Sequence, residues 1–269
     1  MLEWKDDNEL FAIMKKELYS AVIGDILDKM HYTHQFLPQK IQPITEDMVV
    51  VGRAMPVLEA DAFEELSDGQ NPIMKKPFGL MLEALDDLKE NEVYICTGAS
   101  PEYALVGELM CTRMQILKAA GAVVNGFHRD TKGIKELHFP CFSYGRYAQD
   151  QAPRGKVIDF RVPIEMNGVR IEPGDIVFGD LDGVLIIPQA IEKEVIQAAY
   201  EKATGEKMVA EGIKAATGQD VKYIGRLTKA EEYLEGIVSE GDLVMTIGAG
   251  DVFKIGEELV RELERNKNE

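Results

Sequence analysis

The sequence is short of cysteine and of long apolar runs, and both shortages exclude whole classes of protein. Cys96, Cys111 and Cys141 are the only cysteines, and they form neither a CxxC pair nor the spacing of a zinc ligand set. We expect three reduced, mostly buried thiols. No stretch approaches the roughly 20 apolar residues that cross a bilayer, and the first twenty residues carry charge throughout, unlike a signal peptide. These absences predict a soluble, cytoplasmic protein with no membrane partner.

Basic side chains are also in the minority. The chain has 47 acidic and 30 basic residues, which give a formal net charge of −17. This balance argues against broad binding to nucleic acid, because such binding needs basic surface to displace counterions. It does not exclude a local anion site, since a few arginines can dominate a cleft. A hydrophobic fraction of 45% over 269 residues supports a sizeable core, in one large domain or two smaller ones.

Strands and helices alternate along the first part of the chain, and hairpins follow. Helices are expected over 10–30, with a break near Ala21–Gly24 and Ser20 as the cap of the second helix. One helix is expected from Ala104, entered through a turn at Gly107 and closed by Gly121. Single strands are expected over 48–60, 91–99, 122–126 and 141–145. Hairpins are expected over 156–171, with a turn at Asn167-Gly168, and over 173–188, with a turn at Asp180–Gly183. Further helices are expected over 78–88, 127–137 and 191–216. This mixture predicts layers of sheet and helix around a single α/β core.

The sequence changes character after Gly218-Gln219. The last 50 residues, 220–269, are expected to form a small β-α-β-α unit: a strand over 222–227, a helix over 228–240, a strand and turn over 241–251, and a terminal helix over 252–269. A unit of this size holds little core by itself. We therefore expect the tail to dock on the core or on a neighbouring subunit through its apolar stripe of Ile255, Leu259 and Leu263.

Two short segments carry the residue types of an anion and metal site. Arg129-Asp130 follows a buried strand, and Arg matches a carboxylate while Asp supplies a hard oxygen for Mg²⁺ or Mn²⁺. Gly107-Glu108-Leu109-Met110 opens a helix, where free backbone N–H groups bind anions. Taken singly, the dipeptide is usually a solvated ion pair, and Glu108 is usually an acid that favours the helix dipole. Together they form an E-x20-R-D pattern.

Histidine adds little to this pattern. His128 precedes Arg129, and strand alternation predicts that its side chain points away from that of Arg129. His31 and His34 lie in an expected loop, where solvated side chains are commoner than a metal pair.

From about Ser20 to Gly218, the chain resembles the family of the regulator of ribonuclease activity A, RraA. That family includes class II 4-hydroxy-4-methyl-2-oxoglutarate aldolases with oxaloacetate decarboxylase activity. The matching segments are SAVIGDILD, LPQKIQPI, MVVVGRAMPV, GELMCTRMQILKAAGAVVNGFHRD and RGKVIDFRVPIEMNGVRIEPGDIVFGDLDGVLIIP. The resemblance implies an α/β, RraA-like swivelling β/β/α core over residues 1–219, assembled as a homotrimer or a dimer of trimers.

The resemblance also implies a role for each site residue. The family's aldolases carry D-x20-R-D, and Glu108, Arg129 and Asp130 match it. Arg129 would bind the carboxylate of a pyruvate-like substrate, helped by the backbone at Gly107, Leu109 and Met110. Asp130 would hold Mg²⁺ or Mn²⁺, and Glu108 would order a water used in proton transfer. Glu108 replaces an Asp, and an extra methylene moves the carboxylate by about 1 Å, so metal binding is expected to persist more surely than full activity.

The implied function is therefore a metal-dependent lyase that cleaves a 4-substituted 2-keto dicarboxylic acid to release pyruvate. The alternative is a noncatalytic regulator of the RraA type that masks an RNA-degrading enzyme. A third reading is a fusion made for structural reasons, because the tail resembles the end of a UDP-N-acetylmuramate–alanine ligase in the phrase GDLVMTIGAGDVFKIGEEL. No G-x-x-x-x-G-K-[ST] loop occurs in the chain, so ligase activity is not expected.

Overall fold

The computed structural model describes residues 2–62, 71–215, 230, 233–234, 236–239, 241–242, 244–246 and 253–266. The chain divides into two compact units, Met1–Thr204 and Gly205–Glu269. The boundary expected at 219/220 falls among residues that are not described, so it stays a prediction. No helix in the described ranges is long and apolar enough to span a membrane.

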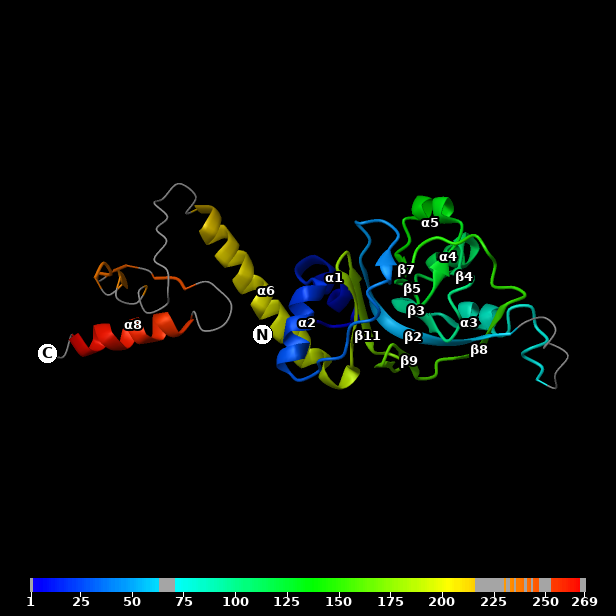
Figure 1. The fold of residues 1–269 in the computed structure, drawn as a ribbon, viewed down its shortest axis with the longest axis horizontal. Coiled ribbons are helices and arrows are strands. Elements are labelled where there is room, and N and C mark those ends of the chain that lie inside the picture. Colours follow the sequence, from blue (N-terminus) through cyan, green and yellow to red (C-terminus); the bar gives the residue numbers. More distant parts are fainter. Residues whose placement is uncertain are drawn as a thin grey trace. The chain divides into compact units, whose positions relative to one another are not determined.

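Within the described residues, the first unit is built on an eight-stranded mixed sheet (Figure 1). Its order is β1-β7-β5-β3-β2-β11-β12, and β8 pairs with the far end of β2. The inner strands β2, β3, β5 and β7 run parallel to one another, whereas β1, β8, β11 and β12 pair antiparallel. The strands are β1 (Gln42–Pro43), β2 (Val50–Asp61), β3 (Glu92–Thr97), β5 (Gly121–Val124), β7 (Cys141–Ser143), β8 (Gly155–Phe160), β11 (Ile176–Asp180) and β12 (Gly183–Ile187).

Helices cover one face of this sheet in two groups. One group packs on β2, β11 and β12 and comprises α1 (Asp7–Glu17), α2 (Ser20–Lys29) and α6 (Glu192–Ala215). The other packs on β2, β3, β5 and β7 and comprises α3 (Met81–Asp87), α4 (Glu108–Ile116) and α5 (Thr131–Leu137). On the opposite face, side chains of the strands pack against one another and against the hairpin of β9 (Ile164–Met166) and β10 (Val169–Ile171). This mixed α/β architecture confirms the layered core expected from the sequence.

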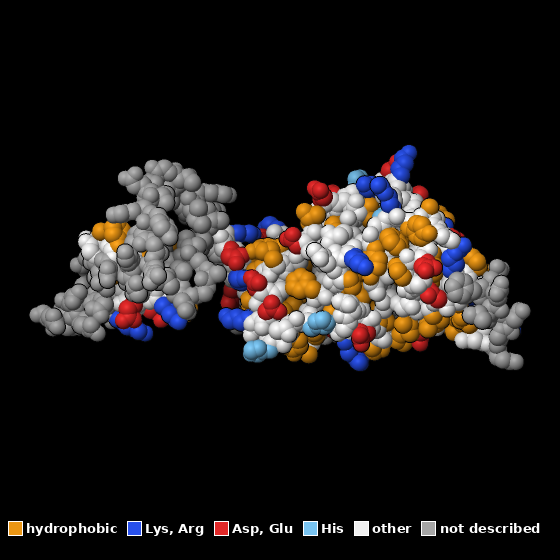
Figure 2. All heavy atoms as spheres, viewed as in Figure 1, with side chains coloured by type: hydrophobic (Ala, Val, Ile, Leu, Met, Phe, Trp, Pro, Cys, Tyr) orange, Lys and Arg blue, Asp and Glu red, His pale blue; other side chains and the backbone are white. Residues whose placement is uncertain are grey.

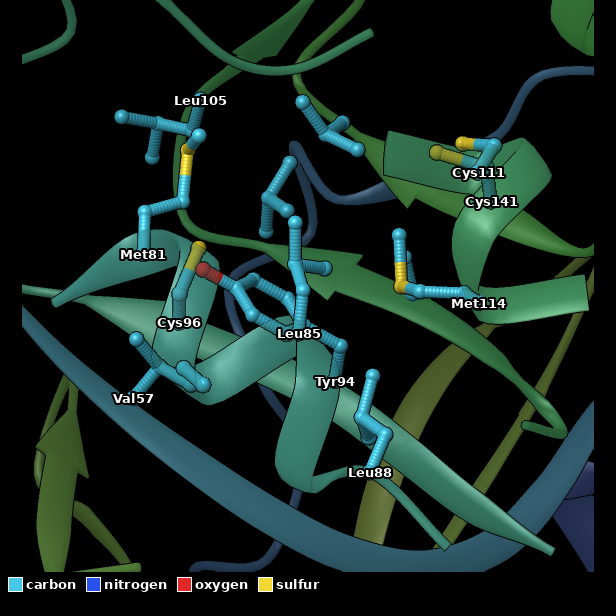
Figure 3. Close-up of a cluster of buried hydrophobic side chains, with 14 of the residues drawn as sticks. Val57, Met81, Leu85, Leu88, Tyr94, Cys96, Leu105, Cys111, Met114 and Cys141 are labelled. Carbon is cyan, nitrogen blue, oxygen red and sulfur yellow. The ribbon is translucent and has the colours of Figure 1, made fainter. Parts of the chain in front are cut away.

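The three cysteines lie in this core, as expected. All three are buried and free. Figure 3 shows the Sγ atoms of Cys111 and Cys141 side by side, whereas Cys96 lies nearer to Tyr94 and Met81. Burial raises the pKa of the Cys96 thiol well above its ordinary value, so that it behaves as a small apolar group.

The break between the first two helices lies earlier than expected. Leu18 and Tyr19 are extended, so α1 ends at Glu17 and α2 begins at Ser20, and the predicted break near Ala21–Gly24 is wrong. Gly24 lies inside α2, where an added Cβ would meet the Phe36 ring at 2.6 Å, so this glycine makes room for an aromatic ring. Ser20 does not cap α2. Its N–H and hydroxyl both donate to the Asp180 carboxylate at 2.7 Å, which ties α2 to the β11–β12 turn.

The stretch from Ala104 to Gly121 is not one helix. Ala104–Val106 forms strand β4, which pairs in parallel with β6 (Phe127–His128), and only Glu108–Ile116 is helical. Gly121 begins β5, where its missing Cβ lets Val50 and Pro140 approach. Hydrophobic spacing cannot separate a three-residue buried strand from the first turn of a helix. The turn at Gly107 is confirmed.

The hairpin predictions are confirmed in part. β11 and β12 turn at Asp180–Gly183 as expected, and Asn167 and Gly168, both with positive φ, connect β9 to β10. The expected hairpin over 156–171 is wrong in its first half, because β8 pairs with the long strand β2 instead.

The tail is described only in part. Helix α8 (Phe253–Asn266) confirms the expected terminal helix, and Ile255 and Leu259 are buried within the second unit. Residues 241–242 and 244–246 form no strand, so the strand expected there is not found in the described part of 241–251. The strand expected over 222–227, the side chain of Leu263 and six residues of the helix expected over 228–240 lie outside the described residues. Of the described residues in 228–240, 230 and 233–234 are helical and 236–239 are not. Docking of the tail on a neighbour stays a prediction.

Candidate active site

The pairing of β4 with β6 brings the two site segments together. Val106 lies opposite His128 in the register, and the Arg129 N–H donates to the Val106 carbonyl at 3.0 Å. Gly107 therefore lies directly beside Arg129-Asp130. An added Cβ on Gly107 would lie 2.6 Å from Asp130 Oδ2, closer than real Cβ contacts come, and 3.3 Å from Arg129 Cγ, which is a tight contact. Glycine therefore lets the Asp130 carboxylate approach the head of α4 closely.

Asp130 occupies an unusual backbone position. Its φ of 56° and ψ of 37° are left-handed, a conformation that costs a non-glycine residue free energy and that Asp tolerates better than most. The residue precedes α5 without capping it through its side chain. Instead, Asp130 Oδ2 accepts from the Glu108 N–H at 3.3 Å and lies 3.7 Å from Arg129 Nε. The turn therefore directs this carboxylate toward Arg129 and the start of α4.

Arg129 lies between two carboxylates. Its Nη1 is 3.2 Å from Asp150 Oδ1, and its Nε is 3.7 Å from Asp130 Oδ2. Between 37% and 44% of each of these three side chains is exposed, so neither ion pair saturates the guanidinium or excludes a ligand from it. In the same place, the N–H groups of the first turn of α4, at Glu108, Leu109 and Met110, have no partner within the helix.

These groups line a cavity of about 440 Å³. Its polar side is formed by Gly107, Arg129, Asp130, Asp150 and Gln151. The rest of the lining is largely apolar and includes Phe78, Met81, Leu82, Leu85, Leu105, Leu109 and Met110. Two of these residues, Met81 and Leu105, lie close together in the buried hydrophobic cluster of Figure 3. An ion pair between Arg113 and Asp86, 2.9 Å long, lies along the cavity wall on α4 and the end of α3.

The structure brings most of the predicted site residues into this cavity, with one exception. Gly107, Leu109, Met110, Arg129 and Asp130 all line it. The side chain of Glu108 does not. Its carboxylate lies over α5, where a Cβ added to Gly133 would be 2.1 Å from Glu108 Oε2.

Asp150 and Gln151 are cavity residues that sequence reasoning missed. They belong to a polar loop, and the bridge between Ala104 and Asp150 holds this loop against β4. No spacing to Arg129 marks them in the sequence. Gln151 is nearly buried and donates through Nε2 to Glu59 Oε2 at 2.9 Å. Burial raises the pKa of Glu59 to about 8, so this acid is mostly protonated at neutral pH.

His128 lies on the other side of the segment, as strand alternation predicts. It is buried and lines a different pocket, with its ring nitrogens 2.7 Å from Ser143 Oγ and 3.0 Å from Thr131 Oγ1. Burial, assisted by the positive charges of Lys135 and Arg146, lowers the pKa of His128 to about 4. His31 and His34 are exposed in a loop, as expected, and His34 Nε2 lies 3.0 Å from the Asn167 carbonyl.

The cavity offers hard oxygen donors for a divalent cation. Asp130 and Asp150 both line it, and Mg²⁺ typically binds through one or two carboxylates plus waters and substrate oxygens. A closed cage of three or more His, Cys, Asp or Glu side chains is absent from the described ranges. The donor set therefore fits an open Mg²⁺ or Mn²⁺ site that substrate completes, and does not fit a structural metal.

Sheet order, helical layers and cavity together define an α/β protein of the RraA fold. The chain belongs to the RraA-like family, described as Aldolase/RraA, whose model matches residues 20–186. A protein of Halalkalibacterium halodurans named "Putative 4-hydroxy-4-methyl-2-oxoglutarate aldolase" is 29% identical over 198 residues, which cover 73% of this chain and 85% of that protein. The crystal structure of Streptomyces coelicolor RraAS2, a member of the RNase ES inhibitor RraA family, matches with a TM-score of 0.66 over 77% of this chain and 99% of that chain. Its identity is 20%, so this likeness concerns the fold alone.

A second likeness is short. A UDP-N-acetylmuramate–L-alanine ligase of Desulforamulus reducens is 43% identical over 58 residues, which cover 22% of this chain and 13% of the ligase. This match agrees with the resemblance noted for the tail and is too small a share of the ligase to carry its activity.

Proposed function

We propose that this chain is a divalent-metal-dependent lyase that cleaves 4-substituted 2-keto dicarboxylic acids and releases pyruvate, by retro-aldol cleavage or by decarboxylation of oxaloacetate. The observation that carries this proposal is the convergence of Arg129, Asp130 and the head of α4 in one cavity. Membership of a family with aldolases supports it. Each group provides a different part of the chemistry.

Arg129 and α4 bind the substrate carboxylate. The guanidinium presents two parallel N–H groups that match a carboxylate, and the free first-turn N–H groups of Leu109 and Met110 add donors from the positive end of the helix. Asp150 orients Arg129 from the far side. Fixed in this way, the keto acid lies with its carbonyl near Asp130.

Asp130, assisted by Asp150, would hold Mg²⁺ or Mn²⁺ in this cavity. When bound, such a cation polarises the keto oxygen of the substrate and stabilises the negative charge that C–C cleavage leaves there. The Glu108 N–H donates to Asp130 Oδ2 at 3.3 Å and Arg129 Nε lies 3.7 Å from the same oxygen, so both groups fix the position of this carboxylate.

The proposed role of Glu108 is indirect. Its carboxylate lies over Gly133, outside the cavity lining, so it acts on a proton only through an intervening water at the head of α4. The apolar lining of the cavity, which includes residues of α3, β4 and α4, places nonpolar side chains beside the reacting carbon.

A homotrimer, or a dimer of trimers, in the cytoplasm completes the proposal. Large apolar side chains beside the cavity are exposed: Leu82 is 60%, Leu109 84% and Ile116 67% accessible. Figure 2 shows hydrophobic side chains on the face of the first unit that carries α3 and α4. Exposed apolar patches of this kind commonly mark an interface. Light scattering of the intact chain tests it, and a monomer at micromolar concentration would rule it out.

The activity is tested by incubating the intact chain with oxaloacetate and, separately, with 4-hydroxy-4-methyl-2-oxoglutarate, in Mg²⁺ or Mn²⁺, while pyruvate is measured. We expect pyruvate from at least one substrate, well above the spontaneous rate, and only the spontaneous rate with Asp130→Ala. Turnover that is equal in Asp130→Ala would reject the site.

The second candidate is a noncatalytic regulator that masks an RNA-degrading enzyme. It is favoured by the net charge of −17, which suits a mask for basic RNA-binding segments, and by the fold shared with Streptomyces coelicolor RraAS2. A chain that is fully folded yet inactive on every keto acid, and that inhibits an RNA-degrading enzyme, would establish this alternative.

A further inference from the structure

A second pocket lies on the other side of the 128–131 segment from the candidate active site. It has a volume of about 230 Å³, smaller than the ~300–1,000 Å³ typical of sites for drug-sized ligands. Three cations line it, namely Lys40, Lys135 and Arg146, from three separate parts of the chain. None of the described residues that line this basic pocket is acidic.

Within the described residues, no carboxylate forms an ion pair with these three cations. In the described part of the chain, none of them forms an ion pair, and Lys40 instead lies 5.7 Å from the centre of the Tyr144 ring. On the same helix as Lys135, by contrast, Lys132 pairs with Glu136 at 3.7 Å and lies outside the basic pocket. Three cations without an ion pair in the described part of the chain therefore meet around one small concavity.

Neutral polar groups complete the pocket. The buried His128 lies 2.7 Å from Ser143 Oγ and 3.0 Å from Thr131 Oγ1, and all three residues line the pocket. Ser143 Oγ also accepts from the Gly145 N–H at 3.1 Å. This network fixes the Thr131 hydroxyl at the pocket surface, where it can donate to a ligand oxygen when the His128 ring donates to it.

We propose that this basic pocket binds a small phosphate group, either inorganic phosphate or the phosphate of a small monoester. Two lysines and one arginine carry three positive charges, enough to neutralise a phosphate dianion, and the arginine supplies the planar fork that matches phosphate oxygens. The volume of the pocket, about 230 Å³, suits a group the size of phosphate. The site is separate from the candidate active site, because no residue lines both pockets.

The test is calorimetric titration of the intact chain with inorganic phosphate and with glycerol 3-phosphate, each against chloride at equal ionic strength. We expect saturable binding of at least one phosphate compound, and the stronger of the two identifies the source. Arg146→Gln and Lys135→Gln should each weaken that binding about tenfold, the usual value of a charge-assisted contact. Both side chains are exposed, so the variants should melt like the parent chain.

Two matched controls separate this site from general electrostatics. Lys132→Gln removes the same charge from the same helix outside the pocket, and it should leave phosphate binding unchanged. Arg129→Ala should also leave it unchanged, because Arg129 lines only the other cavity. The proposal fails if phosphate does not saturate in the millimolar range, if Lys132→Gln weakens binding as much as Lys135→Gln, or if Arg129→Ala alone abolishes it.

Discussion

Two pockets flank the segment 128–131, and they differ in charge, in lining and in the buried group beside each. The candidate active site is mixed in charge and largely apolar, with Arg129 between two carboxylates. The basic pocket holds three cations and no acid among its described lining residues. Glu59 lies behind the candidate active site, and burial raises its pKa to about 8, so it is mostly protonated at neutral pH. His128 lines the basic pocket, and burial lowers its pKa to about 4, so it is neutral at the same pH.

This contrast shows that a segment of four residues can contribute side chains to two separate pockets. In an extended segment, neighbouring side chains point to opposite sides, so His128 and Arg129 reach different pockets although they are adjacent. Both buried titratable groups are uncharged at neutral pH, and the exposed arginine and lysines supply the charge to ligands. Changes on one side should therefore leave the other side intact, and the following variants test this separation.

Arg129→Ala should have the largest effect. Loss of the guanidinium removes the main carboxylate contact, and removal of one preorganised charged donor typically lowers turnover by about 10²–10³-fold. Pyruvate release measured over a range of oxaloacetate concentrations gives kcat/KM. Lys132→Ala, an exposed cation nearby, is the control and should retain full activity. Equal losses in both variants would show that the effect is general charge and not the site.

Glu59→Gln should change the pH dependence of stability. In the folded chain Glu59 keeps its proton up to about pH 8, whereas the unfolded chain releases it near the ordinary value of 4.5. Stability from this group is therefore fully present below pH 4.5 and is lost as pH rises through 8. Glutamine carries no charge in either state, so between about pH 5 and pH 8 the variant should lose less stability than the parent, by about 3 to 4 kcal/mol.

Urea unfolding at several pH values measures the Glu59 effect. The quantity to compare is the difference between the two chains at each pH, because other groups titrate equally in both. Parallel pH profiles for parent and variant would contradict a buried, protonated Glu59.

Gly107→Ala should have a smaller effect, confined to the active-site side. The new Cβ would overlap Asp130 Oδ2 at 2.6 Å, so the carboxylate must move, and small displacements at a reacting centre lower the rate by about tenfold or more. Phosphate binding in the basic pocket should not change. The matched control is Gly205→Ala, where an added Cβ meets nothing within 4 Å. An active Gly107→Ala variant would show that the close approach at the head of α4 is not needed.

Glu108→Asp should have the smallest effect. Its carboxylate lies over Gly133 and outside the cavity lining, so shortening the side chain should change kcat by about twofold at most, as for most surface substitutions. Steady-state kinetics on oxaloacetate measure this change. A change above about tenfold in either direction would place the Glu108 carboxylate much closer to the reaction than the structure does.

The parts that sequence reasoning predicted are those with a local physical signature. Arg129-Asp130 follows a buried strand, Gly107 directly precedes a helix, and Asp180–Gly183 forms a turn. Each of these features can be predicted from a few adjacent residues. The family resemblance supplied the link between Glu108 and Arg129 across 20 intervening residues. Strand alternation alone assigned His128 to the opposite side.

The parts that were missed depend on contacts between distant segments. Asp150 and Gln151 enter the cavity because their loop pairs with Ala104, which no local pattern encodes. The basic pocket needs Lys40, Lys135 and Arg146 to meet from three segments. The orientation of Glu108 depends on the missing side chain of Gly133 on another helix. Tertiary packing decides all three.

The most direct test of the central claim is pyruvate release from oxaloacetate by the intact chain, measured with Mg²⁺, with Mg²⁺ removed by EDTA, and with Asp130→Asn in Mg²⁺. Asparagine keeps the size of the side chain but removes the charge that a cation needs. The account predicts rapid release by the parent chain in Mg²⁺, and only the spontaneous rate after EDTA and in the variant. Release that continues in EDTA, or that is as fast in the Asp130→Asn variant as in the parent, would contradict the proposed site.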